Sequence, residues 1–372
     1  MRIGSLCSGA GALDLAVEQV FGAKTAWHCE IDPAASKVLA HRWPGVPNFG
    51  DLTEVNWNAL RFHINDIDGV SLKPDVLTGG YPCQPFSHAG KRKGTDDERH
   101  IWPYIREAIR RIRPRYTFLE NVSGHRSLGF DRVLGDLAED GMHVRWTSLR
   151  ASDIGAPHQR ERLFILVTDP ERQRYQQALG STTREASGAP FATDGHYRAS
   201  GCVPLDLLPG IARACGNGEL LPTPTSRDHK GHNQRRDKTC LTGALLPTPA
   251  AADGSRGQDL ARANRDGSGG DDLVTLVVKA DRAQQWGKYV DAITRWESIV
   301  GRAPSPTEPN RNGNPRLNPA FSEWMMGWPA GWVTEVPGIS RNDQLRIIGN
   351  GVVPQQAVAA LSWLLSVSEV AA

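Results

Sequence analysis

The alternation of short apolar runs with helical patterns between residues 2 and 167 constrains the fold of this chain more than any other feature. Short runs of apolar and β-branched residues predict buried strands, and longer stretches with apolar side chains at helical spacing predict helices. The predicted strands cover residues 2–6, 25–30, 75–78, 116–120, 143–149 and 162–168. The predicted helices cover residues 12–20, 33–41, 102–111 and 132–140. Strands and helices in alternation predict an α/β fold with a doubly wound, mostly parallel sheet.

The texture of the chain changes after Asp169, where Gly, Pro, Ser, Thr and Arg dominate and the apolar periodicity weakens. A chain of 372 residues is long enough for one large domain and a smaller one. We therefore predict a first domain over residues 1–169 and a second, smaller domain over residues 170–345. Within the second domain LeuLeuProThrPro occurs twice, from Leu220 and from Leu245. Two copies are too few for a solenoid, so the repeat is either a local duplication or a chance recurrence of Pro-rich loop composition.

Regular structure returns in the last segment, residues 346–372. Residues 346–352, ArgIleIleGlyAsnGlyVal, predict a strand or turn, and Pro354 starts an apolar helix that reaches about Leu365. We expect this helix to pack back on the first domain. Before it, the Trp and Met side chains of residues 317–329 have the spacing of a packed helix with a glycine stop.

The formal net charge is only +2, because 43 Lys and Arg nearly balance 41 Asp and Glu. Any surface that binds nucleic acid must therefore be local. Basic clusters occur at Lys91, Arg92 and Lys93, at Arg110, Arg111, Arg113 and Arg115, and between Arg227 and Lys238. An ordinary solvated surface explains such clusters about as well.

Two absences narrow the class of protein. The sequence has no run of about 18 apolar residues and no signal-peptide pattern, so we expect a cytoplasmic protein without a membrane anchor. The six cysteines form no CxxC pair, which argues against a zinc site and against a dithiol redox motif. We expect free thiols and no metal.

A glycine-rich segment follows the first predicted strand. In SerLeuCysSerGlyAlaGlyAlaLeuAspLeu, residues 5–15, Gly9 and Gly11 lie in the turn before the first helix. Glycines there let a ligand approach the backbone, as in cofactor loops. The next strand ends in Glu30, whose carboxylate is placed to accept the hydroxyl groups of a ribose, which favours an adenosyl ligand. Asp51 either accepts the adenine amino group or caps a helix.

The strongest local signal is GlyGlyTyrProCysGlnProPheSer, residues 79–87, directly after the strand at residues 75–78. Cys83 lies between two prolines in a loop at the carboxyl end of a strand, where doubly wound enzymes place their chemistry. A buried structural cysteine normally lies in an apolar strand or helix instead. The turn residues around Cys83 therefore favour a reactive thiol.

Glu120 ends another predicted strand and is expected at the same rim of the sheet. A thiolate that adds to carbon 6 of cytosine makes carbon 5 nucleophilic, provided that ring nitrogen 3 receives a proton or a hydrogen bond. Glu120 supplies that proton only if its pKa is raised, as burial would raise it. The pair of Cys83 and Glu120 thus fits methyl transfer from a sulfonium to carbon 5 of cytosine.

Four short motifs occur in the order ProCysGlnProPheSer, GluAsnVal, ArgGluArg and GlyAsnGlyVal. In this order they resemble the motifs of the cytosine-5 DNA methyltransferases of bacterial or phage type. The resemblance covers residues 2–168 and 346–366, and joint occurrence is far more specific than any single motif. It implies a Rossmann-like fold, S-adenosyl-L-methionine as the cofactor, base flipping, and a covalent bond between Cys83 and carbon 6 of cytosine.

The resemblance also assigns site residues. The catalytic set is Cys83, Glu120, Arg160 and Arg162. The cofactor set is Cys7, Gly9, Ala10, Gly11, Glu30, Ile31, Asp51, Leu52, Pro82, Trp102, Asn350 and Val352. We expect Arg162 to reach oxygen 2 of cytosine and Arg160 to hold the loop. Without the other motifs, the two arginines would indicate only a charged edge strand.

Some positions depart from the family pattern. His158 stands where Gln is usual, so the polar role there falls to His158 or to Gln159. Cys7 replaces an aromatic residue that often precedes the Gly loop, and Gly351 replaces Ser or Ala. Residues 317–329 resemble a segment late in the recognition region of some members, although a packed helix is the favoured explanation.

Base flipping implies double-stranded DNA as the partner and residues 170–345 as a target-recognition domain, opposite a catalytic domain of residues 1–169. Phosphate contacts would come from the clusters at Lys91 and at Arg227. We also expect a monomer and a cognate restriction endonuclease. Methylation of RNA and a catalytically silent DNA-binding protein are the alternatives. The long insertion favours duplex DNA, and the intact catalytic set disfavours a silent protein.

Overall fold

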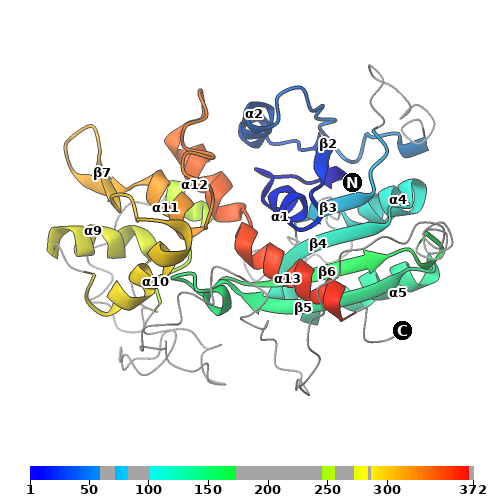
Figure 1. Cartoon of the computed structure of the whole chain (residues 1–372). Coiled ribbons are helices and arrows are strands. Elements are labelled where there is room, and N and C mark those ends of the chain that lie inside the picture. The colour runs from blue at the N-terminus through cyan, green and yellow to red at the C-terminus, as the bar shows by residue number, and fades with distance from the viewer. Residues whose placement is uncertain (59–71, 83–100, 173–244, 256–271, 284–285, 368–372) are drawn as a thin grey trace.

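A six-stranded sheet forms the centre of the fold, in the order β2-β1-β3-β4-β6-β5 (Figure 1). The computed structural model describes residues 1–58, 72–82, 101–172, 245–255, 272–283 and 286–367. The strands are β1 (Arg2–Leu6), β2 (Lys24–Cys29), β3 (Val76–Gly80), β4 (Tyr116–Val122), β5 (His143–Arg150) and β6 (Glu161–Thr168). β1 pairs in parallel with β2 and β3, and β3 pairs in parallel with β4, whereas β6 is antiparallel to both β4 and β5. The prediction of a doubly wound, mostly parallel α/β sheet is confirmed.

Hydrophobic cores cover both faces of the sheet, because successive side chains of a strand point to opposite faces. On β4, Phe118 packs in one core and its neighbour Leu119 in the other. β6 repeats this alternation with Phe164 and Ile165, and the rings of Phe118 and Phe164 stack with centroids 5.8 Å apart. The first core contains α1 (Ala12–Phe21) and α13 (Pro354–Ser366), and the second contains α4 (Trp102–Ile112) and α5 (Phe130–Glu139).

Helix α2 (Pro33–Arg42) lies beside β2 and begins at a cap that the sequence supplies. The Asp32 carboxylate accepts hydrogen bonds from the backbone N–H groups of Ala34 and Ala35 at 3.0 and 2.9 Å, and Pro33 occupies the first helical position. The predicted helices of the first 169 residues are confirmed, with ends close to the predicted ones.

The described residues between 245 and 325 form a second lobe, on the left in Figure 1. Its elements are 3-10 helix η6 (Ala251–Gly254), α9 (Leu273–Ala283), α10 (Val290–Val300), β7 (Thr307–Pro309), β8 (Pro315–Leu317) and α11 (Pro319–Met325). Trp296 of α10 is fully buried, and its indole N–H donates to the Trp324 carbonyl at 2.8 Å. α11 is a buried helix that Gly327 follows with a φ of 67°, so the packed helix predicted within residues 317–329 is confirmed.

Helix α12 (Arg341–Asn350) joins the two lobes and corrects one prediction. Residues 346–350, predicted as a strand or turn, are helical. The β-branched pair Ile347 and Ile348 favoured a strand, but the helix starts upstream, where the Ser340 hydroxyl accepts from the Asp343 N–H at 3.2 Å. α13 follows α12 and packs against α1. The domain boundary at residue 345 stays a prediction and falls within α12.

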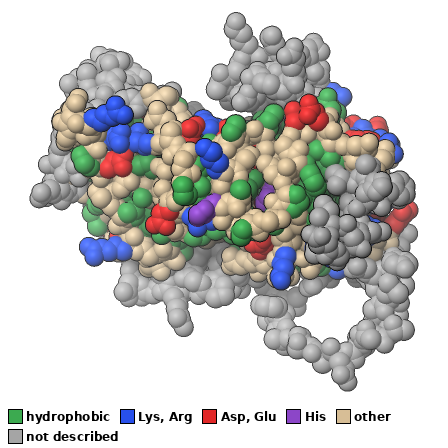
Figure 2. Space-filling view, turned by 90° about the horizontal axis from the view of Figure 1, so that it is seen from above, with side chains coloured by type: hydrophobic (Ala, Val, Ile, Leu, Met, Phe, Trp, Pro, Cys, Tyr) green, Lys and Arg blue, Asp and Glu red, His purple; other side chains and the backbone are tan. Residues whose placement is uncertain are grey.

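Several predicted features lie outside the described residues: Cys83, the cluster at Lys91, Arg92 and Lys93, the basic run from Arg227 to Lys238, and the Leu220 copy of the repeat. Among the residues that the structure describes, no helix is long and apolar enough to cross a membrane. On the face shown in Figure 2, basic side chains of the described residues are interspersed with acidic ones. This distribution agrees with the near-neutral net charge.

Candidate active site

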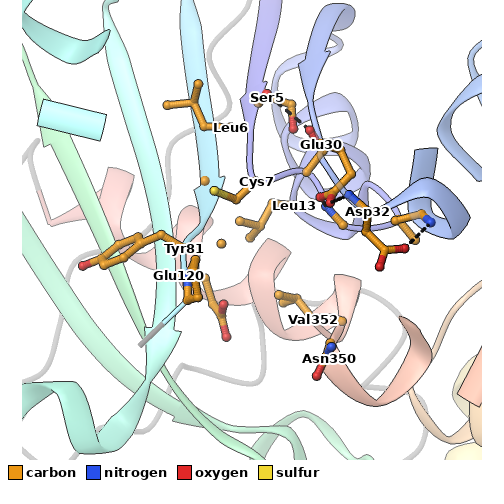
Figure 3. A pocket seen from close by; sticks show the side chains of 18 of the residues that line it. Ser5, Leu6, Cys7, Leu13, Glu30, Asp32, Tyr81, Glu120, Asn350 and Val352 are labelled. Carbon is orange, nitrogen blue, oxygen red and sulfur yellow. Dashed lines mark hydrogen bonds between the residues drawn. The ribbon is translucent and has the colours of Figure 1, made fainter. Parts of the chain in front are cut away.

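A cavity of about 620 Å³ lies at the carboxyl ends of the parallel strands (Figure 3). Leu6 of β1, Cys29 of β2, Gly80 of β3 and Glu120 of β4 all line it, because parallel strands end at the same edge of a sheet. The end of α12 supplies the facing wall with Asn350. The sheet thus brings side chains far apart in the sequence into one pocket of the size that nucleotide-like ligands occupy.

The glycine loop forms the wall between β1 and α1. Gly9 and Gly11 have φ values of 55° and 82°, in the left-handed region that favours glycine. A Cβ at Gly11 would also lie 2.3 Å from the Trp43 ring. Gly9 and Ala10 line the cavity, whereas Gly11 begins α1 behind it. The predicted loop therefore forms, with Gly11 in a supporting place.

Glu30 lies at the cavity wall directly after β2, as predicted. Its carboxylate accepts from the Gly9 N–H at 2.7 Å and from the Asp32 N–H at 2.8 Å. Burial raises the pKa of Glu30, while these backbone hydrogen bonds oppose the rise. A carboxylate oxygen can accept two hydrogen bonds, so both oxygens of Glu30 can also accept hydrogen bonds from ligand hydroxyls. Ile31, next in the chain, also lines the cavity and is 69% exposed.

Asp51 and Leu52 line the cavity as well. One Asp51 carboxylate oxygen accepts from the N–H and the hydroxyl of Thr53, each at 2.8 Å. Asp51 therefore stabilises a turn rather than a helix start, and at the same time faces the cavity. The helix cap is therefore wrong, and the contact with an adenine amino group stays a prediction.

The thiol of Cys7 points into the cavity. Burial raises its pKa to about 12, and the carboxylates of Glu30 and Asp51 add to the rise. Burial also raises the pKa of Cys29, which lines the same cavity. Both sulfurs are therefore neutral thiols at neutral pH, and neither has the thiolate character of a nucleophile.

Glu120 and Arg162 form an ion pair at the cavity wall, with 2.8 Å between Arg162 Nε and Glu120 Oε1. The pair depends on the direction of β6. Because β6 is antiparallel to β4, its first residues lie beside the carboxyl end of β4, and Arg162 is opposite Val122, two residues from Glu120 on the same face. Burial raises the pKa of Glu120, and the charges of Arg162 and Arg160 oppose the rise. The net effect is a pKa above that of an ordinary glutamate.

Arg160 lies behind this wall and does not line the cavity. Its φ is 31° and its side chain is buried. The guanidinium donates to the carbonyls of Pro249 at 3.3 Å and Gly349 at 3.0 Å, and also to that of Gly351. Burial lowers the pKa of Arg160. These contacts fit the expected role of holding the loop, and they join β6 to α12 and to the Leu245 copy of the repeat.

His158 points away from the cavity. Its Nε2 lies 3.0 Å from the Met325 carbonyl, so the ring ties the segment before β6 to α11. Burial lowers the pKa of His158 to about 3, which keeps the ring neutral. The Gln159 backbone carbonyl accepts from the Ala151 N–H at 2.7 Å. Neither side chain lines the cavity.

Asn350 ends α12 and lines the cavity with Val352, and Pro82 lines it after β3, while the cofactor contacts predicted for all three stay predictions. Gly351, between Asn350 and Val352, departs from the family pattern for a physical reason. A Cβ there would lie 2.5 Å from the ring of Trp328, which fills the space.

The residues that line the cavity differ from the predicted site in two ways. Trp102 does not line the cavity: it is buried between α4 and α5, and its indole N–H donates to Asp136 at 2.7 Å. Sequence reasoning missed Ile101, Asn121, Trp328 and Arg346, which do line the cavity. Asn121 was within reach, because it belongs to the GluAsnVal motif, whereas the Trp328 segment indicated only a packed helix.

Comparisons with known proteins identify the family of the chain. The model of the family described as C-5 cytosine-specific DNA methylase matches residues 1–363. The DNA N-6-adenine-methyltransferase of Escherichia phage P1 is 49% identical over 96 residues, which are 26% of this chain and 12% of the phage protein. The Type II methyltransferase M.NaeI of Lentzea aerocolonigenes is 31% identical over 245 residues, or 61% of this chain and 56% of that protein.

Among solved structures, the Dnmt2 methyltransferase of S. pombe has a similar fold, with a TM-score of 0.55 and 13% identity over 99% of both chains. The chain spans 12% and 56% of the lengths of the two curated relatives above. The family match, by contrast, runs from β1 into α13 and includes every cavity wall. The chain belongs to the C-5 cytosine-specific DNA methylase family.

Proposed function

We propose that this protein transfers a methyl group from S-adenosyl-L-methionine to carbon 5 of cytosine in a specific duplex DNA sequence. The observation that carries the proposal is the ion pair of Glu120 and Arg162 at a cavity wall that Pro82 also lines. Cys83 follows Pro82 directly in the chain, which supports a shared site for the nucleophile and the acid.

The residues around the cavity suit an adenosyl ligand. S-Adenosyl-L-methionine supplies, when bound, a methyl group on a positively charged sulfur. Glu30 and Asp51 would accept the ribose hydroxyls and the adenine amino group, and Ile31 and Leu52 offer apolar surface for the adenine ring. The remaining proposed contacts come from Cys7, Gly9, Ala10, Pro82, Asn350 and Val352. Gly11 and Trp102 would act from behind the wall.

Cys83 is the proposed nucleophile, and its thiolate would bond to carbon 6 of the cytosine ring. Cys7 and Cys29 line the same cavity, but burial raises the pKa of both, so they are poor competitors for this role. Cys83 is the third cysteine of the chain and follows the end of β3 in the sequence, and the chemistry of such sheets takes place at the carboxyl ends of their strands.

Glu120 would donate its proton to ring nitrogen 3 as the sulfur adds to carbon 6, which makes carbon 5 electron-rich. The raised pKa of Glu120 supports this role, because the protonated form is needed. Arg162 would donate to oxygen 2 of the ring while it holds the carboxyl group in place. After methyl transfer, the carbon 5 proton would pass to a water molecule as the Cys83 sulfur leaves as a thiolate, and ring nitrogen 3 would return its proton to the Glu120 carboxylate.

Duplex DNA requires that the target base leave the stack, at a cost of about a few kcal/mol. We propose that residues 170–345 form the target-recognition domain, and that residues 1–169 and 346–372 form the catalytic one. The basic clusters at Lys91 and Arg227 would contact phosphates. A monomer in the cytoplasm and a cognate restriction endonuclease belong to the same proposal.

The direct test is methyl transfer from labelled cofactor to plasmid DNA and to bulk RNA. We expect label in DNA, and mass spectrometry of the nucleosides should identify 5-methylcytosine. Label only in RNA, or N6-methyladenine as the product, would overturn the proposal. Bisulfite sequencing of DNA from expressing cells then identifies the target sequence.

A second experiment tests the nucleophile. Duplex DNA with 5-fluorocytosine at the target site should trap a covalent adduct, because fluorine cannot leave as a proton does. Peptide mapping should place the adduct on Cys83, and Cys83→Ala should abolish methylation while it retains specific DNA binding. An adduct on Cys7 or Cys29 would show that another thiol is the nucleophile.

A further inference from the structure

Two tryptophans on one turn hold opposite walls of the cavity. The turn, residues 327–334, follows α11 and is called here the tryptophan turn. The Trp328 indole N–H donates to the Val352 carbonyl at 2.8 Å. The Trp332 indole N–H donates to the Ala10 carbonyl at 2.9 Å, in the glycine loop. One short segment therefore contacts the cavity wall just after the C-terminal end of α12 and the wall just before the N-terminal end of α1.

Hydrogen bonds to Glu323 of α11 hold the tryptophan turn in place. Glu323 is 1% exposed, and its carboxylate accepts from the backbone N–H groups of Gly331 at 2.8 Å and Val333 at 2.5 Å. It also accepts from the Thr334 hydroxyl at 2.9 Å. A buried carboxylate with this many donors fixes the turn, because each broken bond would leave a buried polar group unpaired.

The rings of both tryptophans also pack against residues at the cavity walls. The ring of Trp332 packs edge-on against Trp43 with centroids 5.3 Å apart, and the Arg42 guanidinium lies 5.0 Å from the Trp332 centroid. Trp43 in turn fills the space where Gly11 has no Cβ. On the other wall, the Trp328 ring fills the space beside Gly351. Each wall is thus supported by an aromatic ring against a glycine.

We propose that the tryptophan turn sets the spacing of the two cavity walls, and that Trp328 and Trp332 are positioning residues for the cofactor. The proposal rests on the proposed binding of S-adenosyl-L-methionine in this cavity. Trp332 does not line the cavity, so its effect passes through the Ala10 carbonyl. Because the turn lies within the proposed target-recognition domain, cofactor affinity depends on contacts from that domain.

The test uses Trp332→Phe and Trp328→Phe, which keep an aromatic ring and remove the indole N–H. The dissociation constant of S-adenosylhomocysteine, measured by calorimetry, should rise about three- to tenfold in each, the loss expected for one buried hydrogen bond. For Trp332→Phe, KM for the cofactor should rise equally while kcat at saturating cofactor stays within about twofold. Trp146→Phe is the matched control: Trp146 is an exposed ring on β5, in contact with Phe130, and its change should leave the dissociation constant unaltered.

Variants that keep the fold but bind S-adenosylhomocysteine as the wild type does would overturn the proposal and leave the proposed function intact. Wild-type protein that does not bind it would instead overturn the proposed function. If a variant does not fold, hydrogen exchange of the wild-type protein with and without S-adenosylhomocysteine tests the proposal instead. Binding should slow exchange at the N–H groups of Gly331, Val333 and Thr334, which bond to Glu323 outside the cavity. Unchanged exchange there would refute a coupling between turn and cofactor.

Discussion

At the scale of single residues, Glu120 is governed by two opposed effects. Burial disfavours its charged form, and the nearby guanidinium groups of Arg162 and Arg160 favour it. Burial is the larger effect, so the pKa of Glu120 lies above that of an ordinary glutamate. An arginine whose Nε lies 2.8 Å from the carboxylate limits this rise.

Glu120→Gln should therefore lower kcat by about 100- to 10,000-fold, because an amide donates no proton to the ring. For the wild type, kcat should fall as the pH rises through the raised pKa of Glu120, since the protonated acid is the active form. A pH profile of single-turnover rates measures both effects. Glu139→Gln is the control, because that carboxylate is exposed on α5 and pairs with Arg106 away from the cavity. A wild-type rate that rises with pH across this range would contradict the role of Glu120 as the acid.

At the scale of elements, a buried carboxyl group joins α1 to two strands. Asp14 of α1 accepts from the Ser5 hydroxyl of β1 at 2.8 Å and from the Thr78 hydroxyl of β3 at 2.5 Å. The neutral ring of His28 on β2 lies 3.8 Å away, and burial lowers the pKa of His28 to about 4. Burial raises the pKa of Asp14 to about 7, and the charge of Glu18 adds to the rise. The junction beneath the glycine loop is therefore sensitive to pH.

This arrangement predicts the pH dependence of folding. The folded pKa of Asp14, about 7, exceeds its ordinary value of 3.8, so the protonated group stabilises the fold below about pH 4, and this contribution is lost as the pH rises towards 7. The loss should approach about 1.4 kcal/mol per pH unit across that window. Asp14→Asn does not titrate, so the difference in unfolding free energy between wild type and variant should shrink over the same window. Urea denaturation between about pH 4 and 8 measures it, with exposed Asp131→Asn as the control. A constant difference would show that Asp14 has the same pKa in both states.

At the scale of the whole molecule, one hydrophobic core runs through both lobes. The cluster that contains Phe118 and Phe164 of the sheet also contains Trp296 and Phe321 of the second lobe. Two contacts of α12 add to the connection between the lobes. The Arg160 guanidinium donates to the Gly349 carbonyl, and Gly349 packs against the backbone of residues 250 and 251. The cavity lies between elements from both parts, so its shape depends on their relative position.

Gly349→Ala tests this close approach. An exposed helix position would gain up to about 1 kcal/mol from alanine. At Gly349, however, the new Cβ would lie 2.2 Å from the backbone of Ala250 and Ala251, so we expect a loss of about 1–3 kcal/mol in unfolding free energy. Gly135→Ala on α5 is the matched control, since nothing lies within 4 Å of its Cβ, and it should be neutral or stabilising. Thermal unfolding of both variants gives the comparison, and equal stabilisation of the two would contradict the close packing of α12.

Local patterns were sufficient to predict most of the sheet, whereas the catalytic roles of the residues at its carboxyl edge stay predictions. Apolar runs and glycine turns identified the six strands and the loop at Gly9, because these signals act within a few residues. The same reasoning failed at Ile347, where a β-branched pair favoured a strand while an N-cap at Ser340, several residues upstream, had already started a helix. The predictions for two tryptophans failed for a similar reason. Trp102 was expected at the cofactor and is buried in the core, whereas Trp328 was expected in a packed helix and lines the cavity. A buried tryptophan has the same local sequence pattern whether it faces a core or a cavity.

The amino-acid sequence by itself determined which short motifs follow the strands and where most of the strands lie, since a motif and a period of two are local properties of the chain. Only the tertiary structure decided that Arg162 meets Glu120, because that contact requires β6 to run against β4, and no local pattern encodes the direction of a strand. It also decided that one turn, 322 residues away in the chain, supports the glycine loop through Trp332 and Ala10. Such a contact arises from packing of the complete core.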